Sequence, residues 1–252
     1  MITESKSRPI IFSADMVRAI LDGRKSQTRR IIKPQFNKIW GGGNSVRFGD
    51  DRVSVHVDID TQDGWKWVRC PYGKPGDLLW VKETFVLECW EDEPKFVADR
   101  PTQYYPGDGT EWDQSYWLRP HYKATDPAPD LNYEDDENDD GEPKCKWRSS
   151  MLMPRWVSRI TLKIIDIHVE RLQDISRDDA MAEGVEVVDP YAMAPDLPPG
   201  MPAAFKDYRN ENNFYTADPI RSYRSLWELI HDKKGPPWFS NPFVWVVKFI
   251  KA

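Results

Sequence analysis

The chain has 252 residues, of which 40% are hydrophobic and 30% charged, and these values are typical of a soluble globular protein with a sizeable core. Its formal net charge of -6 argues against a protein that coats nucleic acid uniformly. Residues 134–142, however, hold seven acids in nine positions, so the remainder is near neutral and is compatible with a local cationic site.

The 3 cysteines and 4 histidines are scattered, without the spacing of a disulfide framework or a metal site. No apolar run approaches the length of a membrane span, and no signal peptide precedes the first expected helix. These observations predict a cytoplasmic protein with free thiols, no metal, no cofactor and no membrane partner.

The N-terminal part is expected to form a short strand over residues 8–12 and then an amphipathic helix. Ser13 is placed to cap the start of that helix and Gly23 to end it. A basic run, residues 24–30, follows the glycine. If this run is extended, alternate side chains share a face. One face then carries Lys25, Gln27 and Arg29, and the other carries Arg24, Ser26, Thr28 and Arg30.

Two interpretations of the basic run remain open. Charge runs are commonly solvated, and cations are favourable at the end of a helix. The hydroxyl and amide side chains between the cations instead suit an anionic or polar ligand, which arginine forks would bind.

Alternation of apolar and polar residues over 53–57 predicts a half-buried strand, paired with residues 65–68. A turn over 71–77 then leads into a core strand, 78–85. Glu83 lies near the end of this apolar run. It is expected either to face solvent at an edge or to pair with a cation of the Lys25 cluster.

Two segments have little periodicity and are expected to be insertions: residues 88–148, which are acidic and rich in proline, and residues 187–217, which are rich in proline. Between them lies a second basic and aromatic cluster with Arg155, Trp156 and Arg159. After it, the alternation of apolar residues changes phase at 164–165, which predicts a bulge in a strand.

Ser176 is expected to cap a short helix that Gly184 ends, with Glu183 in its last turn, the unfavourable end for an acid. A cationic neighbour would offset this mismatch. A further helix is expected to begin at Pro219. Its predicted buried stripe consists of Ile220, Tyr223, Leu226, Trp227 and Ile230. The last predicted strand alternates over 243–249.

Three segments carry a resemblance to a known family. The run Gly23-Arg24-Lys25-Ser26-Gln27-Thr28-Arg29-Arg30 follows the pattern G-x-K-x-x-T-x-R, and residues 76–81 and 172–184 come after it in a fixed order. Together they resemble the ASCH domain, a branch of the PUA-like fold. Residues 153–156 and 241–245 are most similar to ASCH proteins of phages and prophages. The resemblance implies an α+β fold in which residues 1–252 form one domain, a small PUA-like β-barrel with flanking helices and two long irregular insertions.

The resemblance also implies two kinds of function. PUA-like domains generally bind RNA, and some relatives flip a modified base into a pocket. The expected partner is thus RNA, a modified nucleoside or another nucleic acid, with Trp80 or Trp156 stacking on a base. The expected contact residues are Arg24, Arg29, Arg30, Glu83, Arg155, Trp156 and Arg159.

The alternative is an enzyme. Some bacterial ASCH proteins are amidohydrolases that deacetylate acetylcytidine with a threonine, a lysine and a glutamate, and the motif places these roles at Thr28, Lys25 and Glu183. A lysine neutralised by desolvation can act as the base for a threonine nucleophile. An ASCH relative with ribonuclease activity implies a third possibility, in which Lys25 and Glu183 form a metal-independent acid–base pair.

Overall fold

The computed structural model of the chain describes ten stretches of residues: 5–36, 38–39, 54–58, 65–90, 101–106, 115–126, 147–189, 203–209, 215–231 and 235–252. The chain divides into two compact units. Unit 1 consists of residues 1–6, 19–77 and 163–250, and unit 2 of residues 7–18, 78–162 and 251–252. Among the described residues, no helix is long and apolar enough to cross a membrane.

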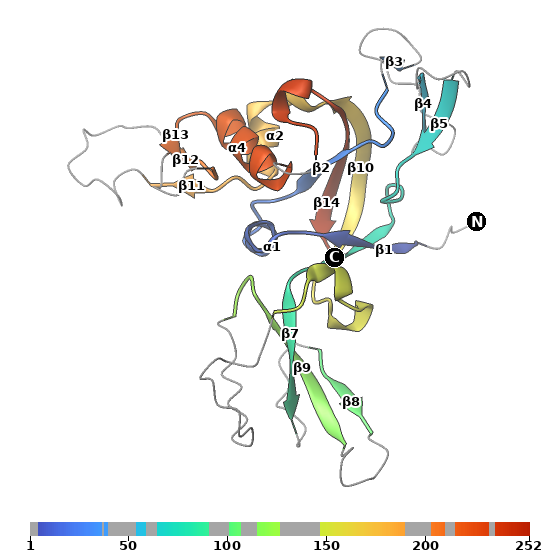
Figure 1. The fold of residues 1–252 in the computed structure, drawn as a ribbon, viewed down its shortest axis with the longest axis vertical. Coiled ribbons are helices and arrows are strands. Elements are labelled where there is room, and N and C mark those ends of the chain that lie inside the picture. The colour runs from blue at the N-terminus through green and yellow to red at the C-terminus, as the bar shows by residue number, and fades with distance from the viewer. Residues whose placement is uncertain are drawn as a thin grey trace, which may run out of the picture. The chain divides into compact units, whose positions relative to one another are not determined.

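The fold is α+β, with several sheets and few helices in the described residues (Figure 1). The largest sheet has the strand order β1-β6-β10-β14-β2. Three smaller sheets have the orders β3-β4-β5, β7-β9-β8 and β11-β12-β13. None of these four sheets closes into a barrel within the described residues, so the expected closed barrel is not seen. One reason lies at the start of β2, where Ser26 donates its amide to the carbonyl of Ala182, the last residue of helix α2, and not to another strand.

In unit 2, strands β1 (Ser7–Ile11) and β6 (Leu78–Lys82) pair in parallel. Helix α1 (Ala14–Leu21) follows β1, and the amide of Met16 lies 3.5 Å from the Ser13 hydroxyl, at the predicted cap. Gly23 (φ 74°), which belongs to unit 1, ends the turn after the helix, as predicted. Two short 3-10 helices, η1 (Ser150–Leu152) and η2 (Arg155–Val157), also belong to this unit.

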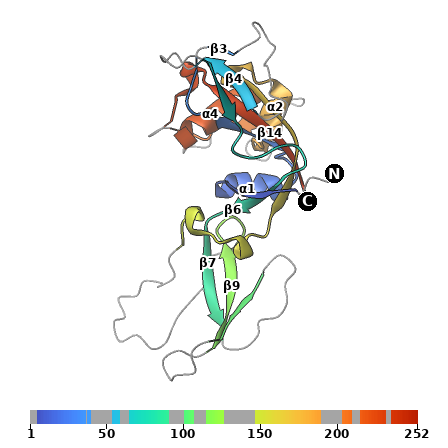
Figure 2. The same cartoon turned by 90° about the vertical axis from the view of Figure 1, so that its right-hand side faces the viewer.

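The segment expected to be an irregular insertion contributes ordered strands to unit 2. These are β7 (Phe85–Trp90), β8 (Gln103–Tyr105) and β9 (Tyr116–Tyr122). They form an antiparallel sheet whose β7–β9 pair is visible in both views (Figures 1 and 2). Aromatic side chains favour strands, and they pair here as Tyr104 with Trp117 and Tyr105 with Tyr116. The acidic residues 127–146 lie outside the described residues.

In unit 1, β2 (Gln27–Ile31) pairs antiparallel with β14 (Phe243–Lys251), with Thr28 opposite Val247 and Arg29 opposite Val246. Strand β14 was predicted to alternate, but residues 243–247 are all buried. Strand β10 (Thr161–Arg171) shows the predicted change of phase, since residues 162 and 164 are buried and then residues 167 and 169.

Helices and small sheets complete unit 1, and α2 lies beside α4 (Figure 1). The predicted stripe of α4 is only partly buried: Tyr223, Leu226 and Trp227 are buried, but Ile230 is 47% exposed. The predicted pairing of two strands over 53–68 is confirmed by β4 and β5. The remaining elements are η3 (Leu172–Asp174), α2 (Arg177–Ala182), α4 (Pro219–His231), η4 (Trp238–Ser240), β3 (Lys38–Ile39), β4 (Ser54–Asp58), β5 (Trp65–Arg69), β11 (Val187–Val188), β12 (Ala204–Lys206) and β13 (Tyr215–Thr216).

Candidate functional site

Two segments that lie 158 positions apart in the sequence meet in unit 1. The first is the turn between α1 and β2, which carries Lys25. The second is the end of α2, where Ser176 accepts the amide of Asp179 as the predicted N-cap and Glu183 is the C-cap. Lys25 and Glu183 form an isolated antiparallel bridge, so their backbones lie side by side. The sequence therefore places these two side chains in one site by ending two helices at the same point.

Gly184 makes this approach possible. It has a φ of 87°, and a Cβ atom built on it would lie 2.8 Å from the Cβ of Ala19 and 2.8 Å from the Cβ of Lys25. A side chain there would be strained by the backbone conformation and would collide with both neighbours. Arg24 strengthens the junction, because its Nη1 donates to the carbonyl of Gly184 at 3.1 Å.

The Lys25–Glu183 contact is a buried ion pair. Lys25 Nζ donates to Glu183 Oε2 at 2.9 Å and to the Glu183 carbonyl at 2.7 Å. The lysine side chain is 0% exposed and the glutamate side chain 2%. Burial lowers the pKa of Lys25; the Glu183 carboxylate acts in the opposite direction, while Arg30 and Arg29 add to the lowering. The net direction is a lysine that loses its proton more easily than one in water.

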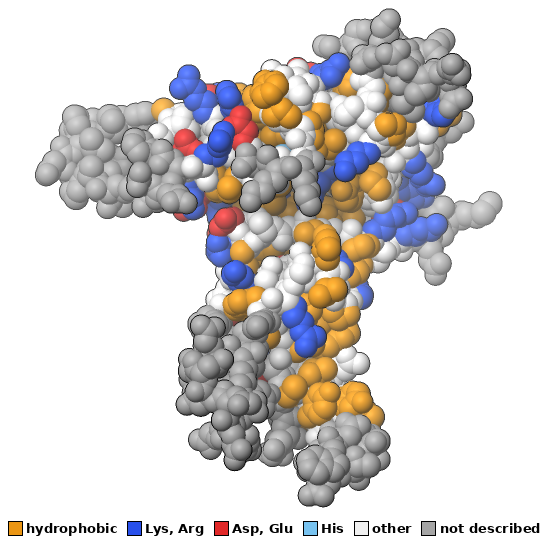
Figure 3. All heavy atoms as spheres, in the orientation of Figure 1, with side chains coloured by type: hydrophobic (Ala, Val, Ile, Leu, Met, Phe, Trp, Pro, Cys, Tyr) orange, Lys and Arg blue, Asp and Glu red, His pale blue; other side chains and the backbone are white. Residues whose placement is uncertain are grey.

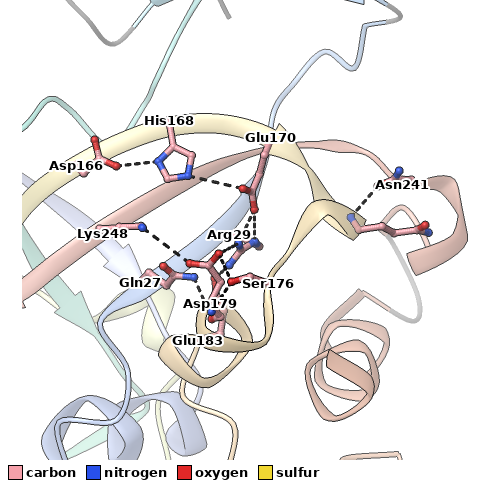
Figure 4. Close-up of polar contacts among 11 residues, drawn as sticks. Gln27, Arg29, Asp166, His168, Glu170, Ser176, Asp179, Glu183, Asn241 and Lys248 are labelled. Carbon is pink, nitrogen blue, oxygen red and sulfur yellow. Dashed lines mark hydrogen bonds and ion pairs between the residues drawn. The ribbon is translucent and has the colours of Figure 1, made fainter. Parts of the chain in front are cut away.

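Arg29 extends the ion pair into a network (Figure 4). Its Nη1 donates to Glu183 Oε1 at 3.1 Å, and its Nε donates to Glu170 Oε1 at 2.8 Å. The side chain is 0% exposed. The two buried cations, Lys25 and Arg29, are thus matched by the carboxylates of Glu183 and Glu170, which satisfies the requirement that buried charges be paired.

The network reaches the surface along β10. Glu170 lies next to His168, whose Nδ1 is 2.8 Å from Asp166 Oδ2 (Figure 4). The Glu170 carboxylate, 3.7 Å from Nε2, raises the pKa of His168 and outweighs burial, with Asp166 adding to the rise. Burial by itself raises the pKa of Glu170, but His168 and Arg29 outweigh it, so that this pKa is lowered. The outer end of the network is therefore built to hold a charged imidazole and a charged carboxylate.

The side chains predicted to share one face of the basic run lie against α2, although Arg24, predicted on the other face, also reaches Gly184 at its end. Gln27 Nε2 donates to the carbonyl of Asp179 at 3.0 Å, so Lys25, Gln27 and Arg29 all contact residues 179–183. Thr28 is buried between Gln27 and Arg29 on β2, and strand alternation puts its side chain on the opposite face. The site thus joins Lys25 to Glu183 but directs Thr28 away from the face of Gln27 and Arg29.

The second predicted cluster belongs to unit 2. Glu83 is buried and does not face solvent: its two oxygens accept Nε and Nη2 of Arg159 at 3.0 and 3.1 Å. Arg159 also lies over the ring of Tyr122 at 3.9 Å. Trp156 packs against the buried cluster that contains Tyr122. Arg155, by contrast, is exposed. Only Arg155 of these residues keeps a charge that is accessible to a ligand.

Sequence reasoning missed several members of the network. Asp166, His168 and Glu170 alternate along β10, so this polar periodicity was a signal for a charged face opposite the apolar one. Tyr223, on α4, gave no such signal. Its ring lies 6.0 Å from the Arg29 guanidinium. Burial, the larger cause, and the negative charge of Glu183 raise the pKa of Tyr223 well above the usual value. Among the described residues, no group of three His, Cys, Asp or Glu side chains could hold a metal ion.

Comparison of the chain with protein-family models, with curated proteins and with solved structures found no match. The arrangement at Lys25 and Glu183 has to be interpreted from its own chemistry. Strongly perturbed, buried ionisable groups that lie together are typical of functional sites, and they also occur in structural ion-pair networks.

Proposed function

We propose that the chain is an ASCH-like protein that binds a nucleotide or nucleic acid, with RNA as the first partner to test. The observation that carries the proposal is the meeting of Lys25 and Glu183 at 2.9 Å, because these residues come from two separate segments that resemble the ASCH domain. In this proposal the open five-stranded sheet is a divergent form of the PUA-like fold.

The third similar segment supports the same proposal. Gly76 donates its amide to Ile164 on β10 at 2.8 Å, and Ile164 donates back to the Asp77 carbonyl at 2.9 Å. The Asp77 carboxylate is buried and accepts the amide of Lys6 at 3.0 Å. This segment fixes the chain just before β6, so each of the similar segments has a defined structural role.

The buried network acts as a framework in this proposal. Lys25 is ion-paired with Glu183 and Arg29 with Glu170, and both cations are shielded from solvent, so neither is suited to hold a phosphate. Contacts with nucleic acid would come from cations with solvent access, such as Arg24, whose side chain is 34% exposed. Such contacts make the affinity depend on salt.

The proposal is tested by fluorescence anisotropy with a labelled single-stranded RNA over a series of salt concentrations. We expect binding whose logarithmic affinity falls linearly with the logarithm of the salt concentration, with a slope of roughly 0.7 per phosphate contacted. Arg24→Gln should weaken binding and reduce that slope, while Arg224→Gln, which removes an exposed cation of α4, should do neither. Absence of binding, or affinity that salt leaves unchanged, contradicts the proposal.

Amide hydrolysis is a second candidate, and the lowered pKa of Lys25 beside Glu183 favours it. Neutral Lys25 would take a proton from a water molecule that attacks the acetyl carbonyl, and the protonated lysine would return that proton through the Glu183 carboxylate to the departing amine. The products are acetate and cytidine, so water supplies the hydroxyl group and the amine gains the proton. Water replaces Thr28 as nucleophile in this scheme because Thr28 lies on the other face of β2.

Incubation of the protein with acetylcytidine, followed by chromatography, tests this second candidate. We expect cytidine release that Glu183→Gln abolishes and that Thr28→Val leaves within about twofold. A loss of turnover in a folded Thr28→Val variant would restore the threonine as nucleophile, and no turnover by the unaltered protein would exclude the candidate. Circular dichroism of each variant separates loss of activity from loss of fold.

A further inference from the structure

A single tryptophan of unit 2 has two cations over its ring. Trp80 lies in the middle of β6, where Leu79 and Val81 are buried and Leu78, Trp80 and Lys82 are half-buried on the other face. Lys82 Nζ is 5.5 Å from the centre of the indole, and Arg155 Cζ, from η2, is 5.8 Å from it. Both distances are within the range of a cation–π interaction. The strand and the 3-10 helix thus bring two positive charges to one aromatic ring.

The partners of these two cations are neutral groups. Lys82 Nζ donates to the Met151 carbonyl, and Arg155 Nη2 lies 3.4 Å from Thr161 Oγ1. Neither forms an ion pair with a carboxylate of the described residues. Arg159, four residues after Arg155, is instead held by both oxygens of Glu83. Two like charges near one ring repel each other, and an anion placed between them would relieve that repulsion.

The positive charge at this ring comes from Lys82 and Arg155 themselves and not from the balance of the unit, whose full sequence holds 13 lysines and arginines against 19 acids. Within its described residues the numbers are nine and four. The bases are Arg8, Arg18, Lys82, Arg119, Lys123, Arg148, Arg155, Arg159 and Lys251, and the acids are Asp15, Glu83, Glu88 and Asp126. Lysine and arginine side chains are interspersed with hydrophobic ones over the region of β7 and β9 (Figure 3).

We propose that Trp80, Lys82 and Arg155 form a contact site for single-stranded nucleic acid, an inference that rests on the proposed function. The two cations would hold phosphates, and the indole would stack on an unpaired base, a combination that single-strand binding proteins use repeatedly. A duplex fits the site less well, because its bases are already stacked on each other and present only their edges.

An anionic membrane surface is the rival partner. Met151 and Leu152 are 69% and 71% exposed next to Lys82, and apolar side chains beside cations can insert into lipid headgroups. The helix that carries them, η1, has only three residues, which is too short to form an amphipathic membrane helix. The cations over an aromatic ring therefore favour the nucleic acid.

The test is anisotropy of a labelled single-stranded RNA of about 12 nucleotides with the full chain, Lys82→Gln/Arg155→Gln and Trp80→Leu. For the double variant we expect at least about tenfold weaker binding and a salt slope lower by roughly 1.4, the value for two phosphates. For Trp80→Leu we expect roughly tenfold weaker binding with the slope unchanged, because stacking carries no charge. The matched control is Arg177→Gln/Arg224→Gln, which removes two exposed cations that are paired with acids in unit 1.

The outcomes separate the two proposals. If the unaltered protein does not bind RNA, the proposed function fails and the contact site fails with it. If it binds and the double variant binds equally well, only the contact site is wrong. Sedimentation with vesicles of anionic lipid is the second arm: binding to vesicles that is lost in the double variant, without any effect on RNA, would assign this surface to a membrane. Equal thermal stability of the variants shows that a change in affinity does not reflect unfolding.

Discussion

At the scale of single residues, Glu183 is the position on which the buried network depends. Its carboxylate contacts both buried cations, Lys25 at 2.9 Å and Arg29 at 3.1 Å. Glu183→Gln would remove the carboxylate that the two buried cations share, while Arg29 keeps Glu170 and Asp179. We expect a loss of about 3–5 kcal/mol in the free energy of unfolding, measured by denaturant titration.

Lys25→Met makes a matched comparison. It removes one cation, but Glu183 keeps Arg29 as its partner, so the loss should be smaller than for Glu183→Gln. Arg224→Gln, which breaks an exposed pair with Glu228, should cost less than about 1 kcal/mol. Equal stability of Glu183→Gln and the unaltered protein would mean that the network does not hold these elements together.

His168 gives the network a dependence on pH. Its pKa is raised above 6.5 by Glu170 in the folded state, so its contribution is complete below 6.5 and is lost as the pH rises through the folded value. Glu170 has a lowered pKa, so its contribution is present above 4.5 and is lost as the pH falls through the folded value. We expect His168→Gln to destabilise the protein more at about pH 5.5 than at about pH 9.

Denaturant titrations of both proteins at those two pH values check this sign. An Asp166→Asn variant is the control that leaves the imidazole in place: it removes one group that raises the pKa of His168, so its effect should have the same sign and be smaller. A larger effect of His168→Gln at the higher pH would show that the imidazole is not held in its charged form.

At the scale of elements, two glycines of the same kind have different surroundings. Gly23 and Gly184 both have positive φ, but a Cβ on Gly23 would meet nothing within 4 Å, whereas one on Gly184 would meet Ala19 and Lys25 at 2.8 Å. Gly23→Ala should therefore cost only the backbone strain, about 1 kcal/mol. Gly184→Ala should cost clearly more, about 2–4 kcal/mol, because α2 would have to move away from Lys25.

Thermal and denaturant unfolding of the two variants tests whether this junction is tight. Equal effects would show that the end of α2 can shift without cost. Gly184→Ala should also move the Glu183 carboxylate, so in that variant Lys25→Met should cost less than it does in the unaltered protein. The difference between the two costs is the coupling energy of a double-mutant cycle.

The ends of elements were the part of the fold that the sequence predicted best. Ser176, Gly23, Gly184 and Pro219 each act locally, and each lies where its backbone preference places a helix end. The ordered strands within residues 88–148 were missed because their pairing is non-local. Strand β8 has only three residues, and it is stabilised by cross-strand aromatic contacts with β9 that periodicity does not show. The absence of a closed barrel among the described sheets was missed for the same reason, because closure of a sheet depends on which strand edges pair.

The site was predictable only in part, and the missing part is again non-local. The common face of Lys25, Gln27 and Arg29 followed from strand alternation, and the approach of Glu183 followed from the ASCH resemblance. No local sequence pattern predicts the pairing of Arg29 with Glu170, which are 141 positions apart. The same holds for Glu83 and Arg159, which are 76 positions apart. Those pairings decide which cations are buried, and hence which are left for a ligand.

At the scale of the whole molecule, the acids of residues 134–142 set the sign of the long-range field. Replacing these nine residues by a neutral glycine–serine linker removes seven negative charges and takes the formal net charge from -6 to +1. If the accessible cations bind nucleic acid, this change should tighten RNA binding at low salt and raise the association rate, because the field steers an anionic ligand from a distance.

The gain in affinity and association rate should vanish at about 1 M salt, where the Debye length falls to about 3 Å. Stopped-flow association with labelled RNA at both salt concentrations measures it. A gain that persists at high salt would instead indicate that the acidic segment occupies the binding surface directly.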